Sequence, residues 1–368
     1  QPTNPNGGIS PSNVRAPRRG DIGTAATLKP VRLGGKILHV DPSGLRLHEM
    51  EYDLGSDSFI SQDLTELADH ISGAGFLKTA YMKRPFGIWW GLRADGVLAA
   101  LTFDREQKVR AWTRIVLGGT NAFVESMCVV RAPDGKSDDL ALAVRRTING
   151  ATVRTIEFIT KPFRADLDGV NESFFVDCGL TYRGVPAGTF TGLDHLEGEL
   201  VVLCGDGARR APQIVAGGSI TINEPKVSTM HIGLLNTARI KTMPPEAGAA
   251  QGSAQNQLKQ VNEISILFLE SMGGTYGREG LRETITARTV EMAQTTAIPL
   301  FTGYRRMTSP FGVDRTGQLE SETSLPLPMT YPVPDVGTRM VCSACGSRKV
   351  RTAPELYPGG IVAQRARC

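Results

Sequence analysis

Large apolar residues recur at every second position through several short runs of this chain. The clearest runs are DLALAVRR (139–146), TVRTIEFIT (152–160) and GSITIN (218–223). Alternation with a period of two predicts β-strands, because successive side chains of a strand point to opposite faces. The run EISILFLE (263–270) is apolar in both phases, which predicts a strand covered on both faces.

Turn signals separate these runs. The four clearest are Asp95-Gly96, Asp134-Gly135, Asn149-Gly150 and Asp206-Gly207. Such pairs favour two-residue hairpins, in which both central residues need a positive φ. About six strands between residues 88 and 160 give the rhythm of propeller blades or a meander. We therefore expect a mainly β fold of propeller-like antiparallel sheets, a smaller β-barrel or sandwich domain and few short helices.

One helix is predicted, over residues 61–73. Leu64, Leu67, Ala68 and Ile71 follow the i, i+3, i+4, i+7 spacing of an apolar stripe. Gly73 is placed to end the helix.

All three tryptophans fall within residues 88–114: Trp89, Trp90 and Trp112. Trp89 and Trp90 are adjacent on a predicted strand that leads to the Asp95-Gly96 turn, so they point to opposite faces. One is expected to fill a core, and the other to meet a neighbouring blade, a subunit or water. Aromatic side chains cover a wide area of a pleated surface. Stacking against a sugar is the alternative use of these side chains.

Composition divides the chain into five segments. Residues 1–30 are polar and rich in Pro, Gly, Asn and Ser, as expected of an extended arm or linker. Residues 31–165 are expected to form the propeller-like region, and 166–255 a small inserted β domain. Residues 256–340 are expected to supply return strands that complete the first region. Residues 341–368 are expected to form an irregular tail.

Charge and cysteine content narrow the function classes. The 41 basic and 37 acidic side chains give a net charge of +4, too balanced for a protein that grips nucleic acid over a large surface. The six cysteines show no disulfide framework, as expected in a reducing cytoplasm. No apolar run approaches the ~20 residues of a membrane-spanning helix. The chain begins at Gln1 without a signal-peptide pattern, so an upstream region is an open possibility.

Two constellations contain residues that could perform chemistry. Asp194, His195 and Glu197 are close in sequence and could bind a metal or share a proton, although the glycines around them favour a structural turn. Cys342 and Cys345 form half of a zinc knuckle, and only Cys368 follows them. These cysteines are incomplete metal-ligand candidates. No phosphate-binding loop or nucleophile elbow is present, and the sequence predicts no catalytic residue, cofactor or metal.

Several segments, taken together and in order, resemble a family of tailed-bacteriophage tail proteins. They are VRLGGKILHVDPSGLRLHEMEYDLGSDSFISQDLTELADHI, IWWGLRADGVLAALTFDREQKVRAWTR, GGTNAFVESMCVV, LALAVRRTINGATVRTIEFI, FTGLDHLEGELVVLCGDG, IPLFTGYRRM and ETSLPLPMTYPV. The family is described as tail tubular protein B-like, nozzle or DNA-stabilisation proteins. The resemblance spans about residues 31–335, and its specificity comes from the ordered co-occurrence of the segments. The segment after residue 340 departs from the pattern.

The resemblance implies a structural virion protein of a short-tailed phage. Family members form a ring, usually a hexamer, at the distal end of the tail. This nozzle encloses the channel that retains and ejects the genome. The implied partners are other copies of the chain, the tail adaptor ring above, tail fibres or spikes, and duplex DNA in transient contact. The implied location is the virion tail, after assembly in the host cytoplasm, and no enzyme activity is implied.

Two other functions remain open on the sequence. A receptor- or glycan-binding virion module would need exposed aromatic side chains, so the positions of Trp89, Trp90 and Trp112 discriminate. A carbohydrate-active propeller enzyme would need two facing carboxyl groups, from Asp95, Glu106 or Glu125.

Overall fold

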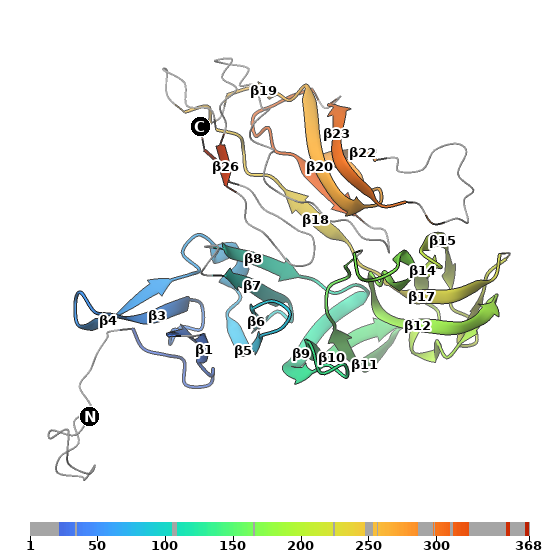
Figure 1. The fold of residues 1–368 in the computed structure, drawn as a ribbon, viewed down its shortest axis with the longest axis horizontal. Coiled ribbons are helices and arrows are strands. Elements are labelled where there is room, and N and C mark those ends of the chain that lie inside the picture. The colour runs from blue at the N-terminus through green and yellow to red at the C-terminus, as the bar shows by residue number, and fades with distance from the viewer. Residues whose placement is uncertain are drawn as a thin grey trace, which may run out of the picture.

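The computed structural model describes residues 22–33, 35–104, 109–164, 166–223, 225–246, 253–255, 257–285, 297, 299–309, 312–323, 351–353 and 365–367. The described chain is mainly β, with several antiparallel sheets (Figure 1). Helical structure in the described residues is limited to α1 (Asp69–Ser72) and the 3₁₀ turns η1 (Val170–Glu172) and η2 (Asp194–Leu196).

The first half of the chain forms three meanders, one after another. The first sheet contains β1 (Val31–Leu33), β2 (Lys36–Val40), β3 (Leu47–Asp53) and β4 (Ser58–Asp63). The second contains β5 (Phe76–Met82), β6 (Ile88–Arg93), β7 (Leu98–Asp104) and β8 (Val109–Ile115). The third contains β9 (Thr120–Arg131), β10 (Asp138–Ile148) and β11 (Ala151–Ile159). Each strand pairs with its sequence neighbour, as short hairpin connections require.

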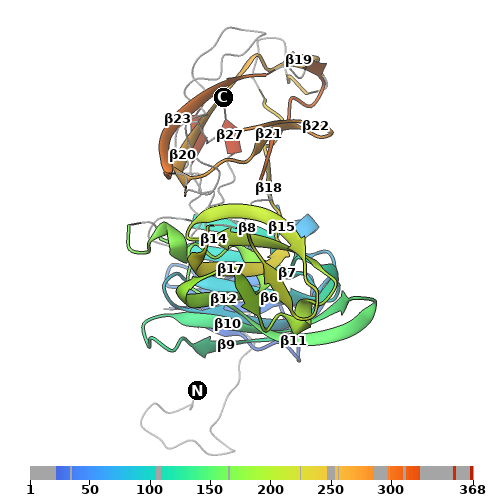
Figure 2. The ribbon, with the colours of Figure 1, turned by 90° about the vertical axis from the view of Figure 1, so that its right-hand side faces the viewer.

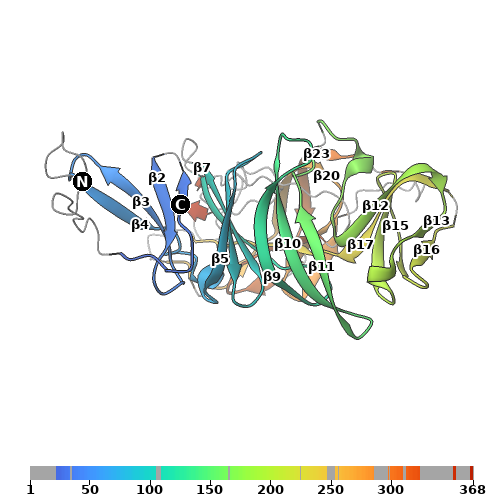
Figure 3. The same ribbon diagram turned by 90° about the horizontal axis from the view of Figure 1, so that it is seen from below.

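Apolar side chains pack these three sheets against one another. One core lies between the first and second sheets and includes Leu38 and Leu47 against Leu101. A second core lies between the second and third sheets and includes Leu98 against Leu142. The middle sheet is therefore apolar on both faces, and all of β6 is buried. Figure 3 shows the sheets following one another along the molecule.

A fourth sheet continues the row. Its order is β12 (Val176–Ala187), β17 (Val227–Leu235), β14 (Leu200–Gly205) and β15 (Ala208–Ile214). The short pair β13 (Thr189–Thr191) and β16 (Ser219–Thr221) lies beside it. Ile148 and Val153, from the β10–β11 hairpin, pack into the core of this unit. The unit therefore adjoins the third sheet directly.

The chain then forms a separate unit above the row (Figure 2). One sheet has the order β18 (Ala238–Lys241), β25 (Glu320–Thr323), β21 (Thr275–Arg278) and β22 (Leu281–Thr284). Two pairs accompany it: β20 (Glu263–Ser271) with β23 (Phe301–Thr308), and β19 (Lys259–Gln260) with β24 (Val313–Asp314). Ile264, Phe268 and Tyr276 are buried in its core. In the C-terminal segment, β26 (Arg351–Ala353) pairs with β27 (Arg365–Arg367).

The predicted return strands are wrong in the part that the structure describes. The strands between residues 259 and 323 pair with one another and with β18, and not with strands of residues 31–165. The predicted 166–255 unit also ends earlier, because β18 belongs to the second unit. Residues 1–21 and most of 324–368 lie outside the described residues. Of the predicted arm, Leu28 is buried in the first core.

The helix predicted over residues 61–73 is also wrong for most of its length. Residues up to Asp63 belong to β4, and only Asp69–Ser72 is helical. The backbone N–H of Leu64 donates to the carbonyl of Leu47, 2.8 Å away, and so continues the pairing with β3. Leu67, an essential member of the predicted stripe, is 75% exposed. Sheet pairing offers this backbone more partners than a short helix, whose nucleation is unfavourable.

The sheets remain open in the described part of the chain, where each strand order is linear and no sheet closes on itself. Two of the four predicted turns have a positive φ at both central residues, at Asn149-Gly150 and Asp206-Gly207. The other two have a positive φ at the glycine alone. At Asp95-Gly96 the hydrogen bonds Arg93 N to Val97 O and Gly96 N to Arg93 O indicate a type I turn followed by a bulge.

Candidate functional site

Trp89 and Trp112 form an aromatic cluster with Phe76 between the first two sheets. The ring centroids of Trp89 lie 5.2 Å from Phe76 and 5.7 Å from Trp112, both nearly perpendicular. Phe76 and Trp112 stack at 6.4 Å. Trp89 is 1% exposed and fills the first core. Perpendicular and offset ring pairs are the favoured aromatic geometries, so this cluster stabilises the contact between the sheets.

Trp112 also fixes the chain segment that follows β4. Its indole Nε1–H donates to the carbonyl of Leu64 at 2.9 Å. This bond joins β8 of the second sheet to the end of the first sheet. Trp112 is half-buried, with its polar atom satisfied.

Trp90 points the opposite way from Trp89, as the sequence predicts. It is 3% exposed and packs in the core between the second and third sheets. Its Nε1–H is buried and has no hydrogen-bond partner among the described residues. Trp90 therefore packs against the neighbouring sheet and is not in contact with water.

The Asp95-Gly96 turn brings β6 and β7 close to the third sheet. Asp95 accepts hydrogen bonds from Arg93 at 2.6 and 3.1 Å, and the Gly96 carbonyl accepts one from Val124 N at 3.0 Å. Gly96 has a φ of +75°, and a Cβ there would overlap the ring of Phe123. The position therefore requires glycine for both conformation and space.

Asp194, His195 and Glu197 lie together in and just after η2, but they do not converge on one point. Glu197 accepts the backbone N–H groups of Gly217 and Gly218 at 2.9 and 2.7 Å. His195 Nε2 lies 3.2 Å from the carbonyl of Cys178. The hydrogen bonds from Gly218 and Gly217 lower the pKa of Glu197. This arrangement is that of a structural turn, the interpretation that the surrounding glycines favoured.

The metal-ligand candidates Cys342, Cys345 and Cys368 lie outside the described residues. Within the described ranges, no group of three or more His, Cys, Asp or Glu side chains could hold a metal ion. Cys128 is exposed, whereas Cys178 and Cys204 are buried. Burial raises the pKa of both buried thiols to about 11.

Where the structure describes them, the carboxylates considered for a glycosidase role are paired with arginine side chains. Asp95 is ion-paired with Arg93. Glu125 accepts two hydrogen bonds from Arg154, at 2.9 and 3.1 Å, and the pKa of Glu125 is lowered by this arginine. A glycosidase acid needs a raised pKa. Glu106 lies outside the described residues.

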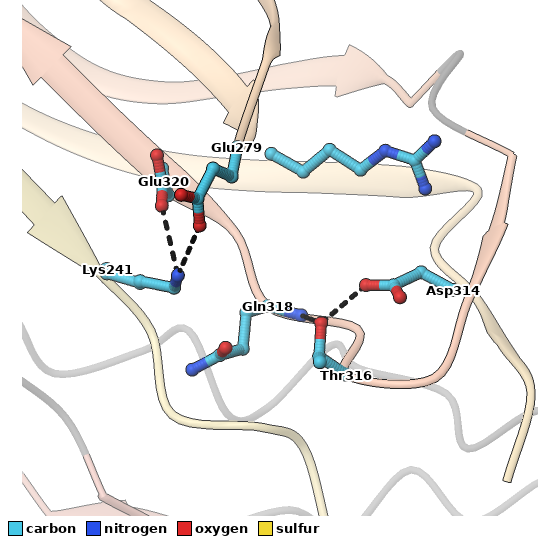
Figure 4. A pocket seen from close by; sticks show the side chains of 7 residues that line it. Lys241, Glu279, Asp314, Thr316, Gln318 and Glu320 are labelled. Carbon is cyan, nitrogen blue, oxygen red and sulfur yellow. Dashed lines mark hydrogen bonds and ion pairs between the residues drawn. The ribbon is translucent and has the colours of Figure 1, made fainter. Parts of the chain in front are cut away.

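The sequence analysis missed a polar pocket in the second unit (Figure 4). Its volume is about 260 Å³, and Lys241, Glu279, Asp314, Thr316 and Glu320 are among the lining residues. Lys241 Nζ lies 3.3 Å from Glu320, because β18 and β25 place these two residues opposite each other. It also lies 3.0 Å from Glu279.

Glu320 is the buried centre of this pocket wall. It is 2% exposed and accepts hydrogen bonds from Arg239 at 2.7 Å and from Arg282 at 2.9 Å. Burial alone would raise the pKa of Glu320, but the bonds from Arg239, Arg282 and Lys241 outweigh it and lower the pKa to about 2. The carboxylate is fully engaged in a structural ion cluster. No sequence signal connects these residues, which come from strands up to 81 positions apart.

Comparison with known protein families finds no matching family model, and no curated protein matches the chain. In the described residues, no helix is both long and apolar enough to cross a membrane.

Proposed function

We propose that this chain is a structural virion protein of a short-tailed phage and forms the distal tail nozzle ring. The ring would enclose the channel through which the genome is retained and ejected. The observation that carries the proposal is the row of consecutive antiparallel sheets, joined face to face by apolar and aromatic side chains (Figure 3). In this proposal the meanders are propeller-like blades, and the row is a wall segment.

The charge of the chain supports a conduit. A net charge of +4 on 368 residues provides few excess cations for the phosphates of a passing duplex. Each neutralised phosphate adds affinity, so a strongly basic channel would hold the DNA and slow its passage. The proposed partners are other copies of the chain, the adaptor ring above, tail fibres or spikes, and DNA in transient contact. The proposed location is the virion tail.

The aromatic packing favours a wall over a glycan-binding surface. Trp89 and Trp90 are buried between sheets, and Trp112 packs with Phe76 and donates its N–H to the backbone. Trp89 and Trp90 therefore offer no open ring face that could stack on a sugar, and Trp112 is only partly exposed. The arginine partners of Asp95 and Glu125 likewise give no support to a glycosidase, and we propose no catalytic residue.

The test is electron microscopy of the native phage particle with this chain located by a C-terminal label. We expect label at the distal end of the short tail, on a closed ring whose central channel admits duplex DNA. The unlabelled particle is the matched control. If the label lies on the capsid or on a peripheral fibre, or if the chain is absent from the particle, the proposal is wrong.

A further inference from the structure

Two histidines lie directly opposite each other on neighbouring strands of the first sheet. His39 on β2 is paired with His48 on β3. Their rings are stacked, with centroids 5.6 Å apart and an angle of 21° between the ring planes. His39 is 6% exposed and His48 is 8% exposed. The two rings therefore share one small buried site, in which a charge on one ring acts strongly on the other.

Neither ring has a hydrogen-bond partner at its Nδ1 atom. Both Nδ1 atoms are buried, and no described residue donates to them or accepts from them. Buried polar atoms are normally paired. A protonated imidazole donates from both ring nitrogens, so a proton on either His39 or His48 would leave a buried N–H without an acceptor. The site as it stands therefore suits two neutral rings.

The carboxylates beside the pair are engaged by other groups. Asp41, in the turn after β2, accepts the backbone N–H of Arg46 at 3.2 Å. Asp63, opposite His48 on β4, accepts the backbone N–H of Thr65 at 2.6 Å and lies 3.4 Å from the Arg46 guanidinium. Each carboxylate therefore offers less compensation to a newly charged imidazole than an unpaired carboxylate would.

The other elements beside the pair add no further carboxylate on its side of the sheet. The described residues from 22 to 33 contain no Asp or Glu, and their charged side chains are Lys29 and Arg32. β1 pairs with β2, so Arg32 lies on the same face as His39. The opposite face of the sheet has its own ion cluster of Lys36, Glu49 and Glu51. Side chains alternate along a strand, so that cluster points away from the two imidazoles.

The pKa of His39 agrees with this geometry. Burial lowers the pKa of His39 from 6.5, and the neighbouring His48 lowers it further, although the Val40 backbone and Asp41 act in the opposite direction. Because the pKa is lower in the folded chain, the unfolded chain takes up the proton first as the pH falls. The stability that the neutral ring provides is present above pH 6.5 and is lost as the pH falls below that value towards the folded pKa.

We infer that the His39–His48 pair makes the first sheet sensitive to acid. A proton on either ring creates a buried charge directly opposite the other imidazole, so the ring must move towards water and disturb the β2–β3 pairing. Leu38 and Leu47, which precede the two histidines in sequence, pack in the core between the first and second sheets. Mild acid therefore loosens the contact between these sheets. The inference is independent of the proposed function, because it concerns the fold of one chain.

Hydrogen exchange followed by mass spectrometry tests the inference on the purified full-length chain. After correction for intrinsic exchange rates, the protection of amides in residues 36–53 should fall about fivefold to tenfold between about pH 7.5 and about pH 5.5, as expected for one proton taken up below an ordinary histidine pKa. The double variant His39→Gln, His48→Gln cannot titrate at this site and should lose this fall. If its protection falls as much as that of the unaltered chain, the inference is wrong.

His70→Gln is the matched control, because His70 is exposed on the neighbouring helix α1. It should show the same acid-dependent fall as the unaltered chain. His231 is also buried with a lowered pKa, but it is present in every variant, so its effect is common to all of them. Circular dichroism should show all variants folded.

A nuclear magnetic resonance titration of the unaltered chain provides a measurement that needs no variant. The His39 ring can be identified by its nuclear Overhauser contact with the His48 ring. Its signals should remain those of a neutral imidazole at about pH 6.5, where an ordinary histidine is half protonated. A half-protonated His39 at that pH, or no loss of protection in the unaltered chain on acidification, would overturn the inference. Neither outcome bears on the ring proposal.

Discussion

The buried indole N–H of Trp90 predicts that substituting this more buried tryptophan costs less stability than substituting the less buried Trp112. Trp90 is 3% exposed, and its Nε1–H has no partner among the described residues. Trp112 is only half-buried, but its Nε1–H donates to the Leu64 carbonyl at 2.9 Å. Both residues lie in the second sheet. We therefore compare Trp90→Phe with Trp112→Phe, because each change removes one indole N–H and part of one ring.

The two substitutions should change the free energy of unfolding by different amounts. Trp90→Phe removes about 40 Å² of buried apolar surface, a loss of about 1 kcal/mol. It also removes an unsatisfied buried donor, whose burial costs about 1–3 kcal/mol. The net change therefore lies between about zero and about 2 kcal/mol of stabilisation. Trp112→Phe loses less apolar burial but leaves the Leu64 carbonyl without its donor, so the change should destabilise the protein by about 2 kcal/mol.

Urea unfolding followed by far-ultraviolet circular dichroism measures this difference, because that signal does not depend on the substituted fluorophores. The unfolding midpoints can be compared when the denaturant slopes of the variants agree. We expect Trp112→Phe to have the lower midpoint. If Trp90→Phe is the less stable variant by more than about 1 kcal/mol, its N–H is satisfied in solution and the reasoning is wrong.

Three further predictions concern a turn, a thiol and a carboxylate. Gly96→Ala should destabilise the fold by at least about 2 kcal/mol more than Gly135→Ala in thermal unfolding, because both have a positive φ but only the first has no room for a Cβ. At about pH 8, alkylation followed by mass spectrometry should modify Cys128 and spare Cys204, since burial raises the pKa of Cys204 to about 11; equal modification would contradict the burial. The pKa of Glu320 is lowered from 4.5 to about 2, so its contribution to stability is present above 4.5 and is lost as pH falls towards 2. Unfolding midpoints of Glu320→Gln should be lower than those of the unaltered chain near pH 7, and the gap should shrink near pH 2; a constant gap would refute this.

Local patterns predicted the strands well where one face is polar. The alternating run of β10 and the Asn149-Gly150 turn form one hairpin with β11. The opposite orientation of Trp89 and Trp90 also follows from strand geometry alone. These features depend only on residues that are close in sequence.

The errors arose where partners are distant in sequence. The helix predicted over residues 61–73 failed because β3 supplies hydrogen bonds to the Leu64 segment. The cluster around Glu320 joins Arg239 and Arg282, which no local pattern relates. The return strands were assigned to the wrong sheet, since alternation specifies which face of a strand is apolar but not which strand lies beside it.

The adjacent tryptophans of β6 have a mechanical consequence. One strand contributes a large anchor to each of two cores, so neither core can separate without moving that strand. The three meanders should therefore open together. The slowest-exchanging amides of all three should then show the same free energy of opening in hydrogen exchange. In the proposed ring, a force on the outermost sheet would therefore be transmitted to the sheets packed behind it, and the sheets would not detach one at a time.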